Sequence, residues 1–135
     1  MNITFLGTGT SQGIPVIGCT CKVCSSLDFR DKRLRTSLYL EIDGLHLVID
    51  TGPDFRTQML REAVPSLDAV LYTHEHKDHT AGLDDIRPFN FKQQIDIPLY
   101  GTRQVLEQIK GEFSYIFAKN KYPGVPRVLL HEISN

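Results

Sequence analysis

The sequence lacks the features of a membrane protein, a secreted protein or a nucleic-acid-binding protein. No stretch approaches the ~18 consecutive apolar residues that a membrane helix needs. Residues 1–10 (MNITFLGTGT) contain no basic region followed by a long apolar run, so no secretory signal is visible. The formal net charge is only -1, which argues against a basic groove built from the whole surface. We therefore expect a cytoplasmic protein without a membrane or nucleic-acid partner.

Cysteine is scarce and odd in number. The three cysteines Cys19, Cys21 and Cys24 have the spacing C-x-C-x2-C. This number and spacing argue against a disulfide framework. In a reducing compartment, cysteines so close together bind metal more often than they pair. The sequence predicts a zinc site of three thiolates, with three free thiols in a loop as the alternative.

The composition is otherwise that of a globular domain. The 135 residues, with 41% hydrophobic and 23% charged side chains, are enough for one domain with a buried core. Basic residues gather at 30–35 (RDKRLR). Such a cluster is typical of a solvated loop, with an anion site as the alternative.

Short apolar runs alternate with amphipathic segments along the chain. Asp43 and Gly44 separate two β-rich runs, and this pair favours a two-residue hairpin turn. Residues 67–73 are almost continuously apolar, as in a strand inside a sheet that is covered on both faces. The predicted strands are 2–7, 37–42, 45–49, 67–73, 97–101 and 127–134, and the predicted helices are 53–64, 80–89 and 102–117.

Prolines and apolar spacing predict where the helices begin or end and which of their residues face the core. Pro53 suits the first turn of the first helix, and Pro88 is expected to stop the second. In both long helices the apolar residues recur at helical spacing. The residues predicted to face the core are Phe55, Met59, Leu60 and Ala63 in the first, and Val105, Ile109, Phe113 and Ile116 in the last.

Residues 73–80 (THEHKDHT) hold three of the five histidines of the chain. His and Asp are good ligands for Zn²⁺, Mn²⁺ and Fe²⁺. His74 and His76 are two positions apart, so in an extended loop both side chains point the same way and can reach one ion. Asp78 and His79 can serve a second ion, and two ions ~3.5–4 Å apart can clamp a phosphoryl or acyl oxygen. The alternative is a polar surface loop.

These segments resemble the metallo-β-lactamase fold superfamily. The resemblance lies in the His-x-His-x-Asp-His motif within 73–83 (THEHKDHTAGL), in 5–19 (FLGTGTSQGIPVIGC) and in 47–56 (LVIDTGPDFR). The cysteine spacing is similar to that of the phosphoribosyl cyclic phosphate phosphodiesterase branch. The resemblance implies an α/β fold of the αββα sandwich type, in which residues 1–135 would be the N-terminal half with a mixed β-sheet.

The resemblance also implies roles for individual residues. His74 and His76 would bind the first of two divalent ions, zinc or manganese, and Asp78 and His79 the second. Asp78 would also orient the hydroxide that attacks phosphorus, which makes it the candidate catalytic residue. Asp50 would brace the histidine loop by hydrogen bonds. In this branch the cysteines bind one structural zinc together with a later histidine, so Cys19, Cys21 and Cys24 would do so here.

The implied activity is that of a metal-dependent hydrolase, a phosphodiesterase acting on a small (cyclic) phosphodiester. The remaining family ligands lie in the later half of the fold, so we expect a truncated chain of low activity, with His46 and His131 as structural residues. One apolar sheet face would be covered by the missing half or by a second copy in a homodimer. The alternatives are a ribonuclease Z-like nuclease and a catalytically silent metal-binding half-domain that self-associates. The residues expected on the uncovered face are Leu38, Leu40, Leu47, Ile49, Val70 and Tyr72.

Overall fold

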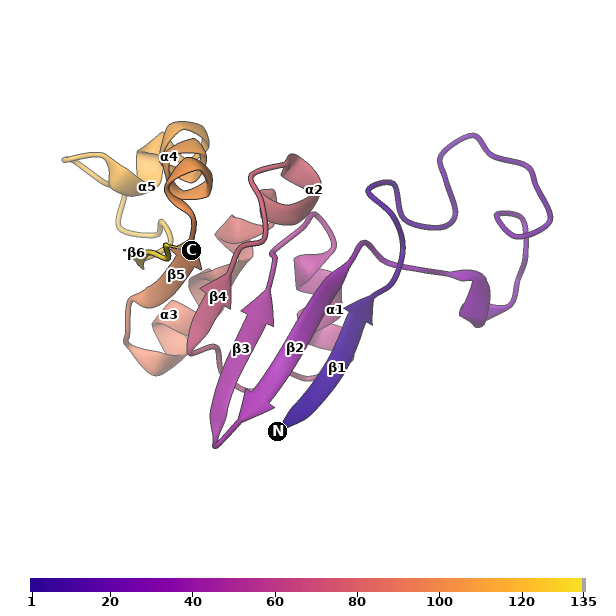
Figure 1. Cartoon of the computed structure of the whole chain (residues 1–135), viewed down its shortest axis with the longest axis horizontal. Helices are drawn as coiled ribbons and strands as arrows, with labels where there is room; N and C mark the ends of the chain where they lie inside the picture. Colours follow the sequence, from indigo (N-terminus) through magenta and orange to yellow (C-terminus); the bar gives the residue numbers. More distant parts are fainter. Residues whose placement is uncertain (135) are drawn as a thin grey trace.

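Six strands form one sheet in which the spatial order equals the order along the chain. The computed structural model describes residues 1–134 (Figure 1). The first three strands pair antiparallel and the last four pair parallel, which gives the mixed sheet that the sequence predicts. The strands are β1 (Asn2–Gly7), β2 (Ser37–Ile42), β3 (Leu45–Ile49), β4 (Ala69–Leu71), β5 (Ile97–Gly101) and β6 (Val128–Glu132).

The turn between β2 and β3 has the predicted conformation. Asp43 and Gly44 both have positive φ, 52° and 83°, as a tight hairpin turn of this twist requires. Strand β4 is shorter than the predicted 67–73. The amide of Leu67 donates instead to the Gln93 side chain at 2.9 Å, and the amide of Thr73 donates to the Asp50 carboxylate at 2.9 Å. Backbone hydrogen bonds still hold Asp68 and Tyr72, and side chains take over at Leu67 and Thr73, one position further out at each end.

The helices follow the prediction except around Pro88. Pro88 lies in the first turn of a helix instead of ending one, because a proline there lacks only an N–H that has no partner within the helix. The segment 80–89 is accordingly divided between three short elements. The helices are α1 (Phe55–Arg61), α2 (Lys77–Thr80), α3 (Arg87–Gln93), α4 (Arg103–Glu112) and α5 (Ser114–Phe117), with 3₁₀ turns η1 (Phe29–Asp31) and η2 (Leu83–Ile86). No helix within residues 1–134 has both the length and the apolar character to cross a bilayer.

The main core lies between the helices and one face of the sheet. Tyr39, Val48, Val70 and Leu99 are partners across adjacent strands and are all buried. The helix residues predicted to face the core are buried, with two exceptions: Leu60 is 63% exposed and Ala63 is also exposed. Leu60 lies within α1 but beside the stripe formed by Phe55, Gln58 and Met59, and Ala63 lies beyond the end of the helix at Arg61. The buried helix residues are Phe55, Met59, Val105, Ile109, Phe113 and Ile116.

The opposite face of the sheet is also apolar but is less well covered. The placement of Val70 and Tyr72 on this face was wrong, because both are buried in the core. Residue Val70 pairs with Val48, so the alternation of strand side chains directs Leu71 to the other face. On that face Ile3 is 51% exposed and Phe5 is 66% exposed. The face comprises Ile3, Phe5, Leu38, Leu40, Leu47, Ile49 and Leu71.

Residues 8–36 form a long excursion between β1 and β2 that extends away from the sheet (Figure 1). Its base is closed by backbone bridges between Gly9 and Arg35 and between Ile14 and Arg33. Glycine is required at this base, because a Cβ on Gly7 would lie 1.9 Å from the carbonyl oxygen of Arg35. The excursion carries the three cysteines.

Candidate metal centres

The histidine loop begins just after β4, at the carboxyl end of a parallel strand. Ligand sites of open α/β sheets are found at this end. His76 has an extended backbone and precedes the first residue of α2, while Asp78 and His79 lie within that helix. The short helix turns the chain back so that residues of the loop and the helix face one space.

The structure brings the four predicted metal-binding residues of this loop together. Each of His74, His76 and Asp78 offers a ligand atom, and these atoms all lie within 4.8 Å of one another. The His79 ring is 3.8 Å from the His74 ring, centroid to centroid. Nε2 of His79 is 3.3 Å from a carboxylate oxygen of Asp78. Two or three imidazoles and a carboxylate at such separations are a suitable donor set for a divalent transition metal.

Asp50 anchors this loop to the end of β3. Its side chain is almost fully buried, with the residue 2% exposed, and its backbone has a φ of 65°. One carboxylate oxygen accepts the Thr73 amide at 2.9 Å. The other accepts the Thr73 hydroxyl at 2.7 Å and lies 2.7 Å from Nδ1 of His79. A buried carboxylate with three such donors holds the start of the loop and its last histidine in fixed relation.

These contacts also determine which ring nitrogen of each histidine can bind a metal. Nδ1 of His79 donates to Asp50, so the lone pair of that ring is on Nε2. The single hydroxyl proton of Thr73 is given to Asp50, so the Thr73 oxygen must accept from Nδ1 of His74 at 3.0 Å. His74 therefore also presents Nε2 as its acceptor. Thr73 was not among the predicted site residues, although it is a polar residue between the apolar strand and the motif.

Two glycines allow the loop to pack directly against the backbone that follows β3. A Cβ on Gly52 would lie 2.2 Å from the carbonyl oxygen of Asp78, and one on Gly82 would lie 2.3 Å from the carbonyl oxygen of Gly52. The Gly82 amide donates to the Thr51 carbonyl at 2.8 Å. Both glycines were missed, and their adjacency to Asp50 and to the motif was the only signal in the sequence.

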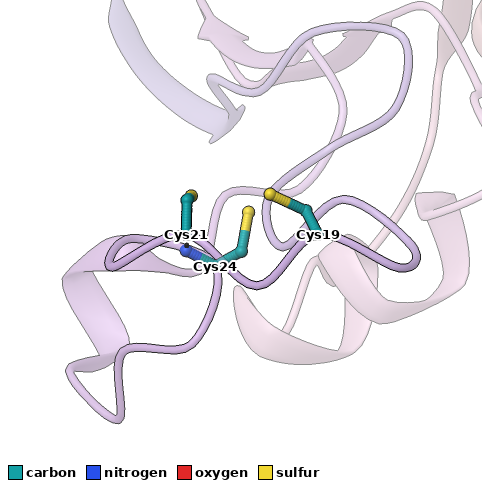
Figure 2. A group of neighbouring side chains, drawn as sticks. All are labelled: Cys19, Cys21 and Cys24. Carbon is teal, nitrogen blue, oxygen red and sulfur yellow. Dashed lines mark hydrogen bonds between the residues drawn. The ribbon is translucent and has the colours of Figure 1, made fainter.

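The three cysteines form a second donor group in the excursion between β1 and β2. Their side chains converge in Figure 2, and their sulfur atoms all lie within 4.8 Å of one another. The amides of Val16 and Cys24 point at the sulfurs of Cys24 and Cys21, at 3.4 and 3.5 Å. The hydrogen bond from the Cys24 amide, helped by the neighbouring Cys19 and Cys24 side chains, lowers the pKa of the Cys21 thiol to about 7. Thiolates so arranged are the usual donors of a structural zinc site.

The other two histidines lie outside both donor groups. His46 hydrogen-bonds the Tyr39 hydroxyl through Nδ1 and stacks on that ring. His131, in β6, stacks on Tyr100 with the ring centroids 5.0 Å apart. Both contacts are between neighbouring strands of the sheet, which is the structural role expected for them.

A family model described as "Beta-lactamase superfamily domain" matches residues 46–135, which include the whole histidine loop. The chain belongs to this family. The metallo-β-lactamase fold predicted from the motif is therefore confirmed, and the six-stranded mixed sheet with its helices is the α/β architecture of this β-lactamase superfamily domain.

Three similar proteins illustrate the range of the superfamily. The chain is 44% identical to a crystal structure described as a new diphosphatase from the PhnP family, with a TM-score of 0.87 over 98% of this chain and 50% of that one. It is 47% identical over 134 residues to a protein of Porphyromonas gingivalis named octanoyltransferase, covering 98% of this chain and 27% of that protein. Zn²⁺-bound PqqB from Methylobacterium extorquens has the same fold, with a TM-score of 0.73 and 24% identity over 100% of this chain and 47% of that one.

The chain thus spans half or less of each of these relatives. The similarity to the octanoyltransferase concerns 27% of that protein, so the name of the whole protein is not carried over to this chain. The similarity to the diphosphatase covers almost all of this chain, including both donor groups.

Proposed function

We propose that this chain carries the metal-binding part of a metal-dependent phosphodiesterase that hydrolyses a small, cyclic phosphodiester. The proposal rests on one observation: His74, His76 and Asp78 place donor atoms within 4.8 Å of one another beside the end of β4. The similarity to a diphosphatase supports the cleavage of a phosphorus–oxygen bond. The similarity to a Zn²⁺-bound protein of the same fold supports the use of a divalent ion.

We propose that this loop holds two divalent ions, zinc or manganese. His74 and His76 would hold one ion and Asp78 and His79 the other. The hydrogen bonds of Thr73 and Asp50 leave Nε2 of His74 and His79 free to bind. Divalent ions bound here supply a Lewis acid for a phosphoryl oxygen and make a water molecule acidic enough to be deprotonated near neutral pH.

The side chains of the loop have separate tasks in this proposal. The Asp78 carboxylate accepts a hydrogen bond from the attacking water and aligns it with phosphorus. Asp50 keeps His79 in place through the 2.7 Å contact with Nδ1, and it does so from a buried position that solvent does not reach. The close backbone approach of Gly52 to Asp78 limits how far Asp78 can move.

The cysteines would hold one structural zinc ion. Zinc in such sites is tetrahedral and takes four ligands. Cys19, Cys21 and Cys24 supply three, and the fourth would be a water molecule, a residue of a partner chain or a histidine elsewhere in the protein. Zinc bound there would hold the excursion of residues 8–36 in shape.

The incompletely covered face of the sheet supports the proposal that another polypeptide segment packs there. Phe5 and Ile3 are more than half exposed on a face that also carries Leu38, Leu40 and Ile49. Contiguous apolar patches of a few hundred Å² are seldom left open to water. We propose that the remaining part of the domain or a second copy in a homodimer packs there, and light scattering on protein of verified mass distinguishes the two.

The test of the activity is hydrolysis of bis(p-nitrophenyl) phosphate with Mn²⁺ or Zn²⁺ added to metal-free protein. We expect slow, metal-dependent release of p-nitrophenol, and its loss when His76 is replaced by alanine. His131→Ala is the matched control, because this histidine lies outside the donor group and its replacement should leave the rate unchanged. Equal rates for the wild type and His76→Ala would refute the proposal.

A catalytically silent metal-binding domain that self-associates is the second candidate. It is favoured by the exposed Phe5 and Ile3 and by a loop that offers only four donors to two ions. In that case the protein binds metal and forms dimers but does not hydrolyse the phosphodiester at any metal concentration.

A further inference from the structure

The two residues between the metal-binding positions of the motif both reach across to helix α4. Glu75 accepts a hydrogen bond from Nε2 of Gln104 at 2.8 Å. The ammonium group of Lys77 lies 2.8 Å from the Glu112 carboxylate and 5.8 Å from the centre of the Phe113 ring. Neither residue has a part in holding a metal in the proposal above.

The two contacts lie at opposite ends of α4. Gln104 and Glu112 are eight positions apart, which corresponds to about 12 Å along a helix. Their partners Glu75 and Lys77 flank His76, the most exposed of the three histidines in the motif. His76 is therefore held between two points of attachment on one rigid helix.

Helix α4 does not need these contacts for its own placement. Val105, Leu106 and Ile109 are at most 5% exposed and attach the helix to the core. The polar contacts instead connect the loop to a helix that is already fixed. The Glu112 side chain is only 15% exposed and is oriented by Gln108, whose amide donates to its other oxygen at 2.9 Å. The Lys77 side chain is 66% exposed, so solvent partly screens this ion pair and its effect is one of position more than of strength.

We propose that Glu75 and Lys77 are positioning residues, which clamp the metal loop onto α4 and so set the place of His76 in the metal site. A further contact joins the segments that follow each partner: the Tyr115 hydroxyl, in α5, donates to the Asp84 carboxylate, in η2, at 2.5 Å. The inference depends on the metal site of the proposed function but not on its substrate. Loss of a partner that orients a metal ligand lowers metal affinity by about 10- to 100-fold.

Replacement of Lys77 tests the proposal, because electrostatics and loss of the clamp predict opposite changes in metal affinity. Replacing Lys77 by methionine removes a positive charge next to a cation site, so electrostatics alone predicts tighter metal binding. Loss of the clamp predicts weaker binding, by about tenfold. Lys77→Arg keeps the charge and can reach Glu112, so it should restore most of the affinity. Lys110→Met is the matched control: Lys110 pairs with Glu107 at 2.8 Å on the same helix but does not contact the loop.

The measurement is titration of the purified, metal-free protein with Mn²⁺, with the free ion followed by electron paramagnetic resonance. Manganese avoids the thiolate site, because thiolates prefer softer metals. Gln104→Ala is the second variant, since it removes the other contact without changing any charge or any buried side chain. We expect weaker binding by Lys77→Met and Gln104→Ala, and unchanged binding by Lys110→Met.

The possible results separate this inference from the proposed function. If the wild type binds Mn²⁺ tightly and both Lys77→Met and Gln104→Ala bind it equally well or more tightly, the proposed clamp is wrong. If Lys77→Met fails to fold, as judged by circular dichroism, Gln104→Ala alone decides in the same way. A wild type that binds no Mn²⁺ would refute the proposed metal site, and the clamp with it. If both variants bind Mn²⁺ more weakly but the wild type does not hydrolyse the phosphodiester, the clamp stands and only the activity is refuted.

Discussion

Replacement of Gly52 by alanine should displace the metal loop by a distance that the structure defines. A Cβ at this position would lie 2.2 Å from the carbonyl oxygen of Asp78, whereas real Cβ atoms essentially never come closer than 3.0 Å to another heavy atom. Asp78 must therefore move by about 0.8 Å, the difference between these two distances. The φ of Gly52 is outside the left-handed region, so alanine is compatible with the backbone and the effect is steric.

Two quantities should change. Overpacking of this kind destabilises a protein by about 1–3 kcal/mol, which urea unfolding of the metal-free protein measures. A misplacement of about 1 Å in a catalytic constellation lowers the rate by up to about 100-fold, and we expect a comparable loss of Mn²⁺ affinity because Asp78 is one of the donors. The carbonyl is part of the backbone, so it cannot rotate away as a flexible side chain would.

Gly111→Ala is the matched control for this substitution. Gly111 lies in α4, and a Cβ there would meet nothing within 4 Å. Alanine in a helix is more favourable than glycine by up to about 1 kcal/mol, so this variant should be as stable as the wild type or more so, with unchanged Mn²⁺ affinity. Wild-type stability and affinity in Gly52→Ala would show that the loop can move freely there and would refute the steric argument.

Three further predictions concern the brace, the thiols and the core. Thr73→Val should cost about 1–2 kcal/mol and release His74 from a single tautomer, which long-range ¹⁵N–¹H spectra of the imidazole would record, whereas Thr73→Ser should behave like the wild type. In zinc-free protein Cys21 should be the thiol alkylated fastest at pH 7, because its pKa is lowered to about 7 and its thiolate predominates above that pH. Peptide mass spectrometry after iodoacetamide treatment tests this, and equal rates at all three cysteines would contradict it. Met59→Ala should destabilise by about 2–5 kcal/mol and Leu60→Ala by less than about 1 kcal/mol, since Met59 is 7% and Leu60 63% exposed; equal losses would contradict the burial pattern.

Local patterns in the sequence were sufficient for the strands and for the main donor groups. Five of the six strands begin within one residue of the predicted start, and the Asp43–Gly44 turn has the expected conformation. The histidines and Asp78 converge because they are close in sequence at the end of one strand. These features depend on neighbours along the chain, which is the information that a sequence pattern contains.

Features that depend on register or on distant partners were missed. The face of Val70 could not be read from a strand that is apolar on both sides, because a shift of one residue exchanges the two faces. The contacts of Glu75 and Lys77 join positions about thirty residues apart, and no local pattern indicates them. The carbonyl contact of Gly52 likewise depends on how two backbone segments approach in space.

The sheet in which spatial order equals chain order has a consequence for how the protein is made. Each strand from β2 to β6 pairs with the strand synthesised just before it, so a nascent chain always has a finished edge on which the next strand can be laid. Asp50, Thr73 and His79 can meet as soon as residue 79 is available, whereas Gln104 and Glu112 are translated later. During synthesis the metal loop can therefore form its contacts with Asp50 before its contacts with helix α4. His76 reaches its final position only after α4 has been made.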